Sequence, residues 1–194
     1  MNLNIAFQMD HISTIDIKTD STYLLLKEGQ IRNYNQYHYE PKDLFLKAGK
    51  PFAEAQKISL SLDSTNSNFL SQKEIIDLSS MDIIFIRQDP PFNMQYLSTT
   101  YFLEIIESNV LIINKPSSVR NAPEKLFVNK FKNLMPPTLI SSNFEQIKKF
   151  REEEKDIILK PLYGNGGESI IYLSQKDKNF SSILEMYKKL YNSP

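Results

Sequence analysis

The fold is decided by the stretch that begins with Asp82-Ile-Ile-Phe-Ile-Arg87. This stretch continues through the segment from Gln95 to Ser108 and ends in Val110-Leu-Ile-Ile113. The two short apolar runs predict buried strands, and apolar residues recur between them at helical spacing. A strand, a helix and a strand in this order predict a parallel sheet covered by helices. Function gathers in the loops beyond the carboxyl ends of such strands, here residues 10–20, 88–93 and 114–120.

The residues before this stretch predict the start of the same sheet. Leu3 to Met9 is an apolar run typical of a buried strand, and Asp20 and Ser21 are suitable caps for a helix that ends near Gly29. The other expected elements are a strand with Tyr34, Tyr37 and Tyr39, a hairpin over 44–62 that turns at 48–50, and an exposed loop over 63–71.

A second region follows, with a boundary near residue 121. Two residue pairs have the spacing of a capping box: Asn121 with Glu124, for a helix through Phe131, and Ser142 with Glu145, for a helix ending near Arg151. Strands over 156–160 and 169–173 and a helix over 183–190 complete an α+β arrangement. We therefore predict an α/β chain with two domains, a Rossmann-like parallel-sheet domain over 1–121 and an α+β lobe over 122–194.

The composition is that of a globular protein. Among 194 residues, 41% are hydrophobic and 24% charged, and 23 basic side chains balance 23 acidic ones, which argues against a nucleic-acid partner. The absence of cysteine excludes disulfides, thiolate metal sites and a cysteine nucleophile. The apolar runs are too short to span a membrane, and the first residues do not resemble a secretory signal, so a cytoplasmic location is expected.

A glycine-rich loop is the strongest chemical signal in the chain. Three of the five glycines occur in Gly164-Asn165-Gly166-Gly167, between two predicted strands. Glycine allows consecutive backbone N–H groups to turn toward one anion and permits its close approach. An ordinary hairpin turn explains the same residues. Neither of the common glycine-rich nucleotide motifs fits this loop.

Two lysines accompany the loop. Lys160 ends the strand before it, and strand alternation places this side chain on the inner face, where a lysine requires a negative partner. Lys125 lies one turn into the helix predicted after Asn121. Each lysine alone is typical of a solvated surface, but together with the glycine loop they suggest a phosphate clamp.

Arg87 and Asp89 follow a predicted strand directly and precede Pro90-Pro91. One interpretation is that Arg87 binds a substrate carboxylate while Asp89 receives an amine. The alternative is an Arg–Asp pair that holds its own loop. Asp20 and Ser21 likewise fit either of two roles, capping of a helix or contact with a substrate.

Several of these segments occur in the order found in bacterial glutathione synthetases of the ATP-grasp superfamily, and the chain resembles that family from its first strand to about Leu173. The matching segments are Met9-Asp10, residues 15–21, Arg87-Gln-Asp-Pro-Pro-Phe92, Asn114-Lys-Pro116, Arg120, Glu124-Lys-Leu-Phe127, Asp156-Ile-Ile-Leu-Lys-Pro-Leu162 and Gly164-Asn-Gly-Gly167. The segment around Arg87 is the most specific to the family.

The resemblance implies a fold and a site. It implies a pre-ATP-grasp, substrate-binding domain over 1–121 and an incomplete ATP-grasp, nucleotide-binding lobe over 122–194. The residues expected to bind ATP are Lys125, Lys160, Gly164, Asn165, Gly166, Gly167 and Ser169, and those expected to bind substrate are Asp20, Ser21, Arg87 and Asp89.

The resemblance also implies a reaction. ATP phosphorylates the cysteinyl carboxylate of γ-glutamylcysteine, and the amine of glycine attacks the acyl phosphate to give glutathione. Positioning and charge neutralisation by cations, backbone amides and Mg²⁺ are sufficient for such phosphoryl transfer, so no catalytic side chain is named. The Mg²⁺ ligands are expected beyond Pro194, because the chain covers little more than half of a typical family member. The resemblance leaves open whether the chain forms a homo-oligomer.

Three residues depart from the family pattern: His11 where proline is usual, Asn93 where aspartate is usual, and Glu168 at a position that is normally small. A negative charge at Glu168 repels phosphate unless the side chain points away. The sequence therefore leaves two interpretations. In one, the chain is part of a glutathione synthetase and is inactive alone. In the other, the chain is a non-catalytic module or partner subunit that binds a nucleotide or dipeptide.

Overall fold

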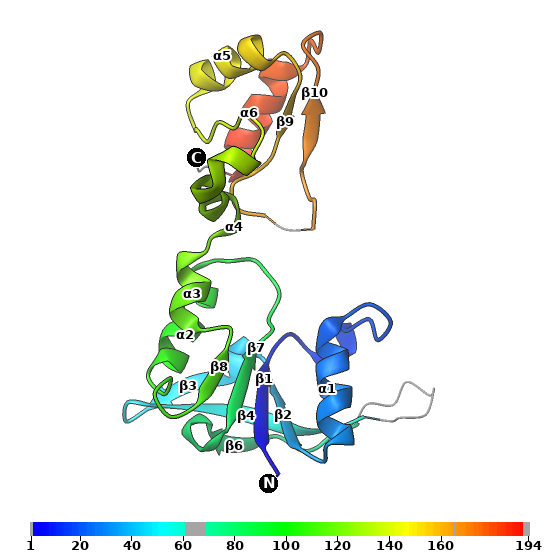
Figure 1. Cartoon of the computed structure of the whole chain (residues 1–194), viewed down its shortest axis with the longest axis vertical. Coiled ribbons are helices and arrows are strands. Elements are labelled where there is room, and N and C mark those ends of the chain that lie inside the picture. Colours follow the sequence, from blue (N-terminus) through cyan, green and yellow to red (C-terminus); the bar gives the residue numbers. More distant parts are fainter. Residues whose placement is uncertain (1, 61–68, 165, 192–194) are drawn as a thin grey trace. The chain divides into compact units, whose positions relative to one another are not determined.

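The computed structural model describes residues 2–60, 69–164 and 166–191. The chain divides into two compact units, Met1–Asn121 and Ala122–Pro194, which are drawn in Figure 1 and described separately below. None of the described helices is long and apolar enough to cross a membrane.

The first unit is built on one mixed sheet. Its parallel part has the order β2-β1-β7-β8, formed by Asn35–Tyr39, Asn4–Gln8, Ile83–Ile86 and Leu111–Ile113. Beyond β2 the sheet is antiparallel: β4 (Lys50–Ser59) pairs with β2, β3 (Leu44–Lys47), β5 (Phe69–Leu70) and β6 (Glu74–Asp77). The predicted parallel sheet is therefore confirmed for four strands, and four antiparallel strands, β3, β4, β5 and β6, extend it.

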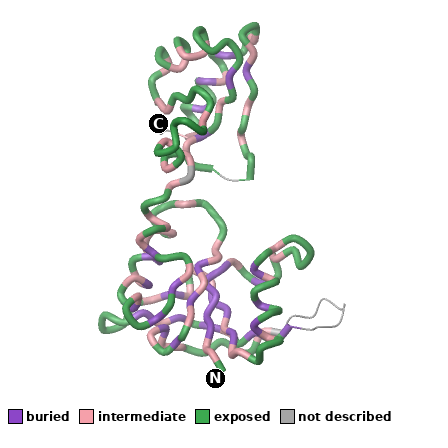
Figure 2. The backbone as a smooth tube through the Cα atoms, in the orientation of Figure 1, coloured by how far each residue is buried: buried purple, intermediate pink, exposed green. Residues whose placement is uncertain are grey.

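Helices cover both faces of the parallel part. On one face α1 (Ser21–Ile31) packs through Leu26 against Ile5 and Phe7 of β1. On the other face, Leu103 of α2 (Met94–Glu104) packs with Ala6. Figure 2 shows the buried residues concentrated in these strands. Because β1 is buried on both faces, its successive residues Ile5, Ala6 and Phe7 are all apolar.

Short helices complete the first unit. They are the 3₁₀ helices η1 (Ile12–Thr14), η2 (Pro41–Asp43) and η3 (Leu78–Ser80), and the helix α3 (Pro116–Asn121).

The second unit pairs two strands antiparallel, β9 (Ile157–Leu159) and β10 (Ile171–Leu173). Helices α5 (Phe144–Glu154) and α6 (Phe180–Tyr191) pack on this ribbon through a core of Ile157, Leu173, Phe180 and Leu184. The unit begins with α4 (Glu124–Phe127) and the 3₁₀ helix η4 (Val128–Leu134).

Two predicted caps are wrong. Asn121 ends α3 instead of capping the next helix, because Pro116 starts a helix earlier and Pro123 disfavours its continuation through Ala122. The cap of α5 is Asn143, one residue after the predicted Ser142, and its side chain accepts from Glu145 N at 2.9 Å.

The predicted loop over 63–71 is only partly testable. Residues 61–68 lie outside the described residues, whereas Phe69–Leu70 forms strand β5 against β4. Strand β6 has no counterpart in the prediction, and α1 runs two residues past Gly29 to Ile31. The hairpin turn is confirmed, with positive φ at Ala48 and Gly49 between β3 and β4.

Candidate functional site

Arg87 lies at the carboxyl end of β7 and reaches the start of α1. Its Nε donates to Thr22 Oγ1 at 2.9 Å and its Nη2 to Ser21 Oγ at 2.8 Å. Both hydroxyls are in the first turn of α1, and Asp20 caps this helix by accepting from Thr22 N at 2.6 Å. The structure thus brings Arg87 and Ser21 together. Within the described part of the chain, no group accepts a hydrogen bond from Nη1 of Arg87.

Asp89 lies beside this guanidinium on the loop after β7. Its backbone N–H donates to Asp10 Oδ2 at 2.7 Å. Burial raises the pKa of Asp89, and the charges of Asp10 and Asp20 raise it further, while Arg87 lowers it. Across residues 2–60, 69–164 and 166–191 Arg87 forms no ion pair, so the Arg87–Asp89 pair considered from the sequence is not formed.

A buried polar network underlies this cluster. Gln8 is fully buried at the end of β1; its Nε2 donates to Gln88 Oε1 and to Thr99 Oγ1, the latter at 3.1 Å. Its Oε1 accepts from Tyr39 OH at 3.3 Å. The network fixes the ends of β1 and β7 through satisfied hydrogen bonds. Sequence reasoning does not identify Gln8, although a polar residue inside an apolar strand is a usable signal.

His38 is a second buried polar residue near the cluster. Its ring Nε2 lies 3.2 Å from the carbonyl oxygen of Asp10, so Nε2 carries the proton and donates. Burial lowers the pKa of His38. His11, which replaces the usual proline, caps η1 by accepting from Ser13 N at 3.3 Å. Asn93, which replaces the usual aspartate, caps α2. Both departures therefore have structural roles.

In the second unit Lys125 holds the start of the glycine loop. From α4 its Nζ donates to the carbonyl oxygens of Pro161 at 2.6 Å and of Gly164 at 3.1 Å. The lysine is partly buried. The structure therefore brings Lys125 to the loop that the sequence singled out, in contact with carbonyl oxygens.

The loop itself has the conformation that requires glycine. Gly166 and Gly167 have φ of 60° and 78°, which side chains rarely adopt. No described group accepts a hydrogen bond from the N–H of Gly167 or Glu168, and successive free N–H groups in such a turn can receive an anion. Asn165 lies outside the described residues. The Glu168 side chain is exposed.

Ser169 closes the loop and is bound by α6. Tyr187 OH donates to the Ser169 carbonyl oxygen, and Tyr191 OH donates to Ser169 Oγ at 2.5 Å. Ser169 was predicted from the sequence but neither tyrosine was, although two aromatic residues spaced i, i+4 on the last helix mark one helical face.

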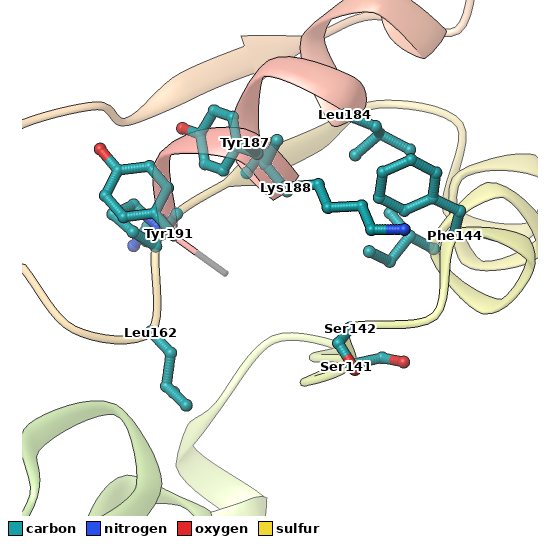
Figure 3. Close-up of a pocket in the computed structure, with 12 residues that line it drawn as sticks. Ser141, Ser142, Phe144, Leu162, Leu184, Tyr187, Lys188 and Tyr191 are labelled. Atoms are coloured by element: carbon teal, nitrogen blue, oxygen red, sulfur yellow. The ribbon is translucent and has the colours of Figure 1, made fainter. Parts of the chain in front are cut away.

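Lys160 lies beside the loop and lines a pocket of about 430 Å³. Figure 3 shows Lys188, Tyr187 and Tyr191 of α6 in the wall of this pocket, opposite Ser141 and Ser142. Lys160 is exposed, so the prediction of an inner-face lysine is wrong. The reason is the register of β9, in which Ile157 faces the core and Ile158 faces solvent.

No metal centre can be assigned among the described residues, since nowhere do three His, Asp or Glu side chains gather as ligands. The acidic run Glu152-Glu153-Glu154 is exposed at the end of α5, as expected for solvated surface. Each unit thus has its own candidate cluster: Arg87 and Asp89 at strand ends in the first unit, and the lysines with the glycine loop in the second.

Two solved structures are similar in fold to this chain. A RimK-domain ATP-grasp protein from Sphaerobacter thermophilus superposes with a TM-score of 0.60 at 13% identity over 96% of this chain and 59% of that one. D-alanyl-alanine synthetase A from Vibrio cholerae superposes with a TM-score of 0.57 at 12% identity over 97% of this chain and 57% of the other. The chain therefore has the fold of an ATP-grasp protein.

Sequence comparison narrows this class to one family. Residues 3–120 match the model of the prokaryotic glutathione synthetase N-terminal domain, and residues 124–194 match that of its ATP-grasp domain. Glutathione synthetases from Agrobacterium fabrum and Mesorhizobium japonicum are 47% and 45% identical over 98% and 100% of this chain, respectively. The chain belongs to the prokaryotic glutathione synthetase family, and it spans 60% and 62% of the length of these two relatives.

Proposed function

We propose that this chain is part of an enzyme that joins γ-glutamylcysteine and glycine to glutathione, using ATP and an acyl phosphate intermediate. The observation that carries the proposal is that a single family matches both units, and with them both clusters of the site. The partners are then small molecules in the cytoplasm, and neither a nucleic acid nor a membrane is required.

The first unit has the chemistry to hold the dipeptide substrate. Ser21 and Thr22 fix two sides of the Arg87 guanidinium, which leaves Nη1 to bind a carboxylate. Asp89 and Asp10 place negative charge beside it, which suits a substrate ammonium group. A dipeptide with both groups is therefore matched by opposite charges in one cluster.

The second unit has the chemistry to hold phosphate. Lys160 is exposed and lines the pocket, and the loop after it contains the N–H groups of Gly167 and Glu168, from which no described group accepts a hydrogen bond. These groups fit the phosphates of ATP, whose transfer depends on positioning and charge neutralisation. ATP-grasp ligases use Mg²⁺ to supply the remaining positive charge, and we expect its ligands outside the described residues.

The test is a chimera in which residues 1–194 are joined to the part of the Agrobacterium fabrum relative that lies beyond the match. We expect phosphate release from ATP that depends on both γ-glutamylcysteine and glycine. Lys160→Ala should remove a cation that faces phosphate, at a cost of about 2–4 kcal/mol, and so slow the reaction roughly thirty- to a thousand-fold. Lys160→Arg should recover only part of the rate, because the planar guanidinium group of arginine does not replace the compact ammonium group of lysine.

Lys176→Ala is the matched control, since Lys176 is exposed and follows β10, away from the glycine loop. A chimera that binds ATP without turnover would favour the non-catalytic binding module instead. Equal rates for the Lys160→Ala and Lys176→Ala variants would contradict the assigned role of Lys160.

A further inference from the structure

The carboxyl end of the glycine loop has a backbone conformation that its own residue does not favour. Ser169 has a φ of 56°, in the left-handed region that residues with a side chain rarely adopt. Such a conformation persists only where its surroundings hold it. The geometry of the loop up to Gly167 therefore depends on what holds Ser169.

Two tyrosines of α6 bind the carbonyl and the hydroxyl group of Ser169. Tyr187 OH donates to its carbonyl oxygen and Tyr191 OH to its hydroxyl oxygen. The residues are one helical turn apart, and their ring centroids are 5.3 Å apart. Figure 3 shows the two rings side by side on α6 with their hydroxyls pointing the same way, away from Lys188.

These hydroxyls have no other partner within the described part of the chain. Tyr187 is 9% exposed, and burial raises its pKa, so the phenol stays protonated and remains a donor at neutral pH. The rings fill space in the wall of the pocket, whereas the hydroxyls act only on Ser169. The two roles can therefore be separated by Tyr→Phe substitutions, which keep the ring.

We infer that Tyr187 and Tyr191 are positioning residues for the glycine loop. By fixing Ser169 in the left-handed conformation, they fix the direction of the N–H groups of Gly167 and Glu168, from which no described group accepts a hydrogen bond and which can face an anion. The consequence for ATP rests on the proposed function, but the effect on the loop does not. A preorganised loop loses less conformational entropy on binding and therefore binds more tightly.

The experiment compares the 194-residue chain with the Tyr187→Phe/Tyr191→Phe double variant by ¹⁵N relaxation. The chain has only five glycines, so the amide signals of Gly166 and Gly167 can be assigned readily. We expect their order parameters to fall from about 0.8 toward about 0.6 or below, with changed amide shifts at Ser169. The thermal midpoint of the second unit should change by less than about 3 °C, because the rings remain.

Two further variants make the test specific. Ser169→Ala and Tyr191→Phe remove the same hydrogen bond, so their effects on the loop should not add. Tyr172→Phe is the control, because its hydroxyl donates to Asp156 Oδ2 at 2.9 Å and does not contact the loop. Unchanged order parameters in the double variant, or an equal change with Tyr172→Phe, would overturn the inference.

Titration of the same proteins with ATP and Mg²⁺ separates this inference from the proposed function. A looser loop together with about tenfold weaker ATP binding supports both. A looser loop in a chain that binds no ATP supports the positioning role and counts against the nucleotide site. ATP binding with an unchanged loop supports the nucleotide site and rejects the positioning role.

Discussion

His38 is buried beside the Arg87 cluster with only one of its two ring nitrogens bonded: Nε2 donates to Asp10 O, while Nδ1 has no partner among the described residues. Protonation would add a buried, unpaired N–H, and burial accordingly lowers the pKa of His38 from its ordinary 6.5. The charge of His11 lowers it further, whereas Asp10 O and the charges of Glu40 and Asp43 raise it.

This shift predicts a loss of stability in acid. Because the pKa of His38 is lower in the folded state, the unfolded chain binds more protons just below pH 6.5, and the free energy of unfolding falls as pH drops toward the folded-state pKa. The loss should approach about 1.4 kcal/mol per pH unit within that window. Urea unfolding at pH 7.5 and 5.5 measures it. His38→Gln should reduce the pH dependence and His11→Gln should largely retain it; equal dependence in wild type and His38→Gln would contradict the argument.

At the scale of elements, helix α1 is docked on strand β2 through Gly29. A Cβ placed on Gly29 would lie 2.4 Å from Gln36 Oε1, and Gln36 is 2% exposed with its Nε2 donating to Leu26 O at 2.9 Å. The helix therefore approaches the strand closely only because residue 29 has no side chain.

Gly29→Ala should consequently destabilise the chain by about 1–3 kcal/mol, although the same change in an exposed helix would stabilise it. Urea denaturation measures the effect. In a Gln36→Ala background the added methyl group has space, and the penalty should shrink or change sign. A stabilising Gly29→Ala in the wild-type background would show that Gln36 moves aside at little cost.

At the scale of the whole molecule, the two units have cores of very different size. Among the described residues, the first unit contains two buried apolar clusters that together include twenty residues, whereas the buried cluster of the second unit includes four. Units of about 70 residues with small cores are marginally stable. We therefore expect the second unit to unfold at a lower temperature than the first.

Scanning calorimetry should show two transitions in the 194-residue chain. Leu184→Ala, in the second core, should lower the first transition, and Leu103→Ala, in the first core, should lower the second; each substitution costs about 2–5 kcal/mol. Assigning the transitions by circular dichroism of these variants tests the order. A single transition shifted equally by both would mean that the units unfold together.

Much of this architecture was predictable because local patterns and tertiary packing agree. The apolar runs predicted as strands pair with one another in the parallel part of the sheet as β1, β7 and β8, and Asp20 caps α1 as its residue type indicates. Strand β6 could not be predicted, since its Ile75 is 66% exposed and the strand exists only through pairing with β4. Likewise no local pattern indicates that Arg87 binds Ser21, because 66 residues separate them.

The residue types of the candidate site could be predicted from the sequence, but their hydrogen-bond partners could not. Lysines, glycines and Arg87 stand out in the sequence by chemistry alone. The sequence contains no local signal that Lys125 donates to Pro161 O and Gly164 O, or that Tyr187 and Tyr191 bind Ser169, because these bonds depend on how α4 and α6 pack on the loop. The exposure of Lys160 depends in the same way on the register of β9.

Lys125 uses two of the three N–H donors of its ammonium group on the glycine loop, since Nζ donates to Pro161 O and to Gly164 O. In the proposed nucleotide site, the third donor can therefore be given to an anion without breaking either of these bonds. The same side chain would then tie the loop in place and serve as the counter-ion of the ligand.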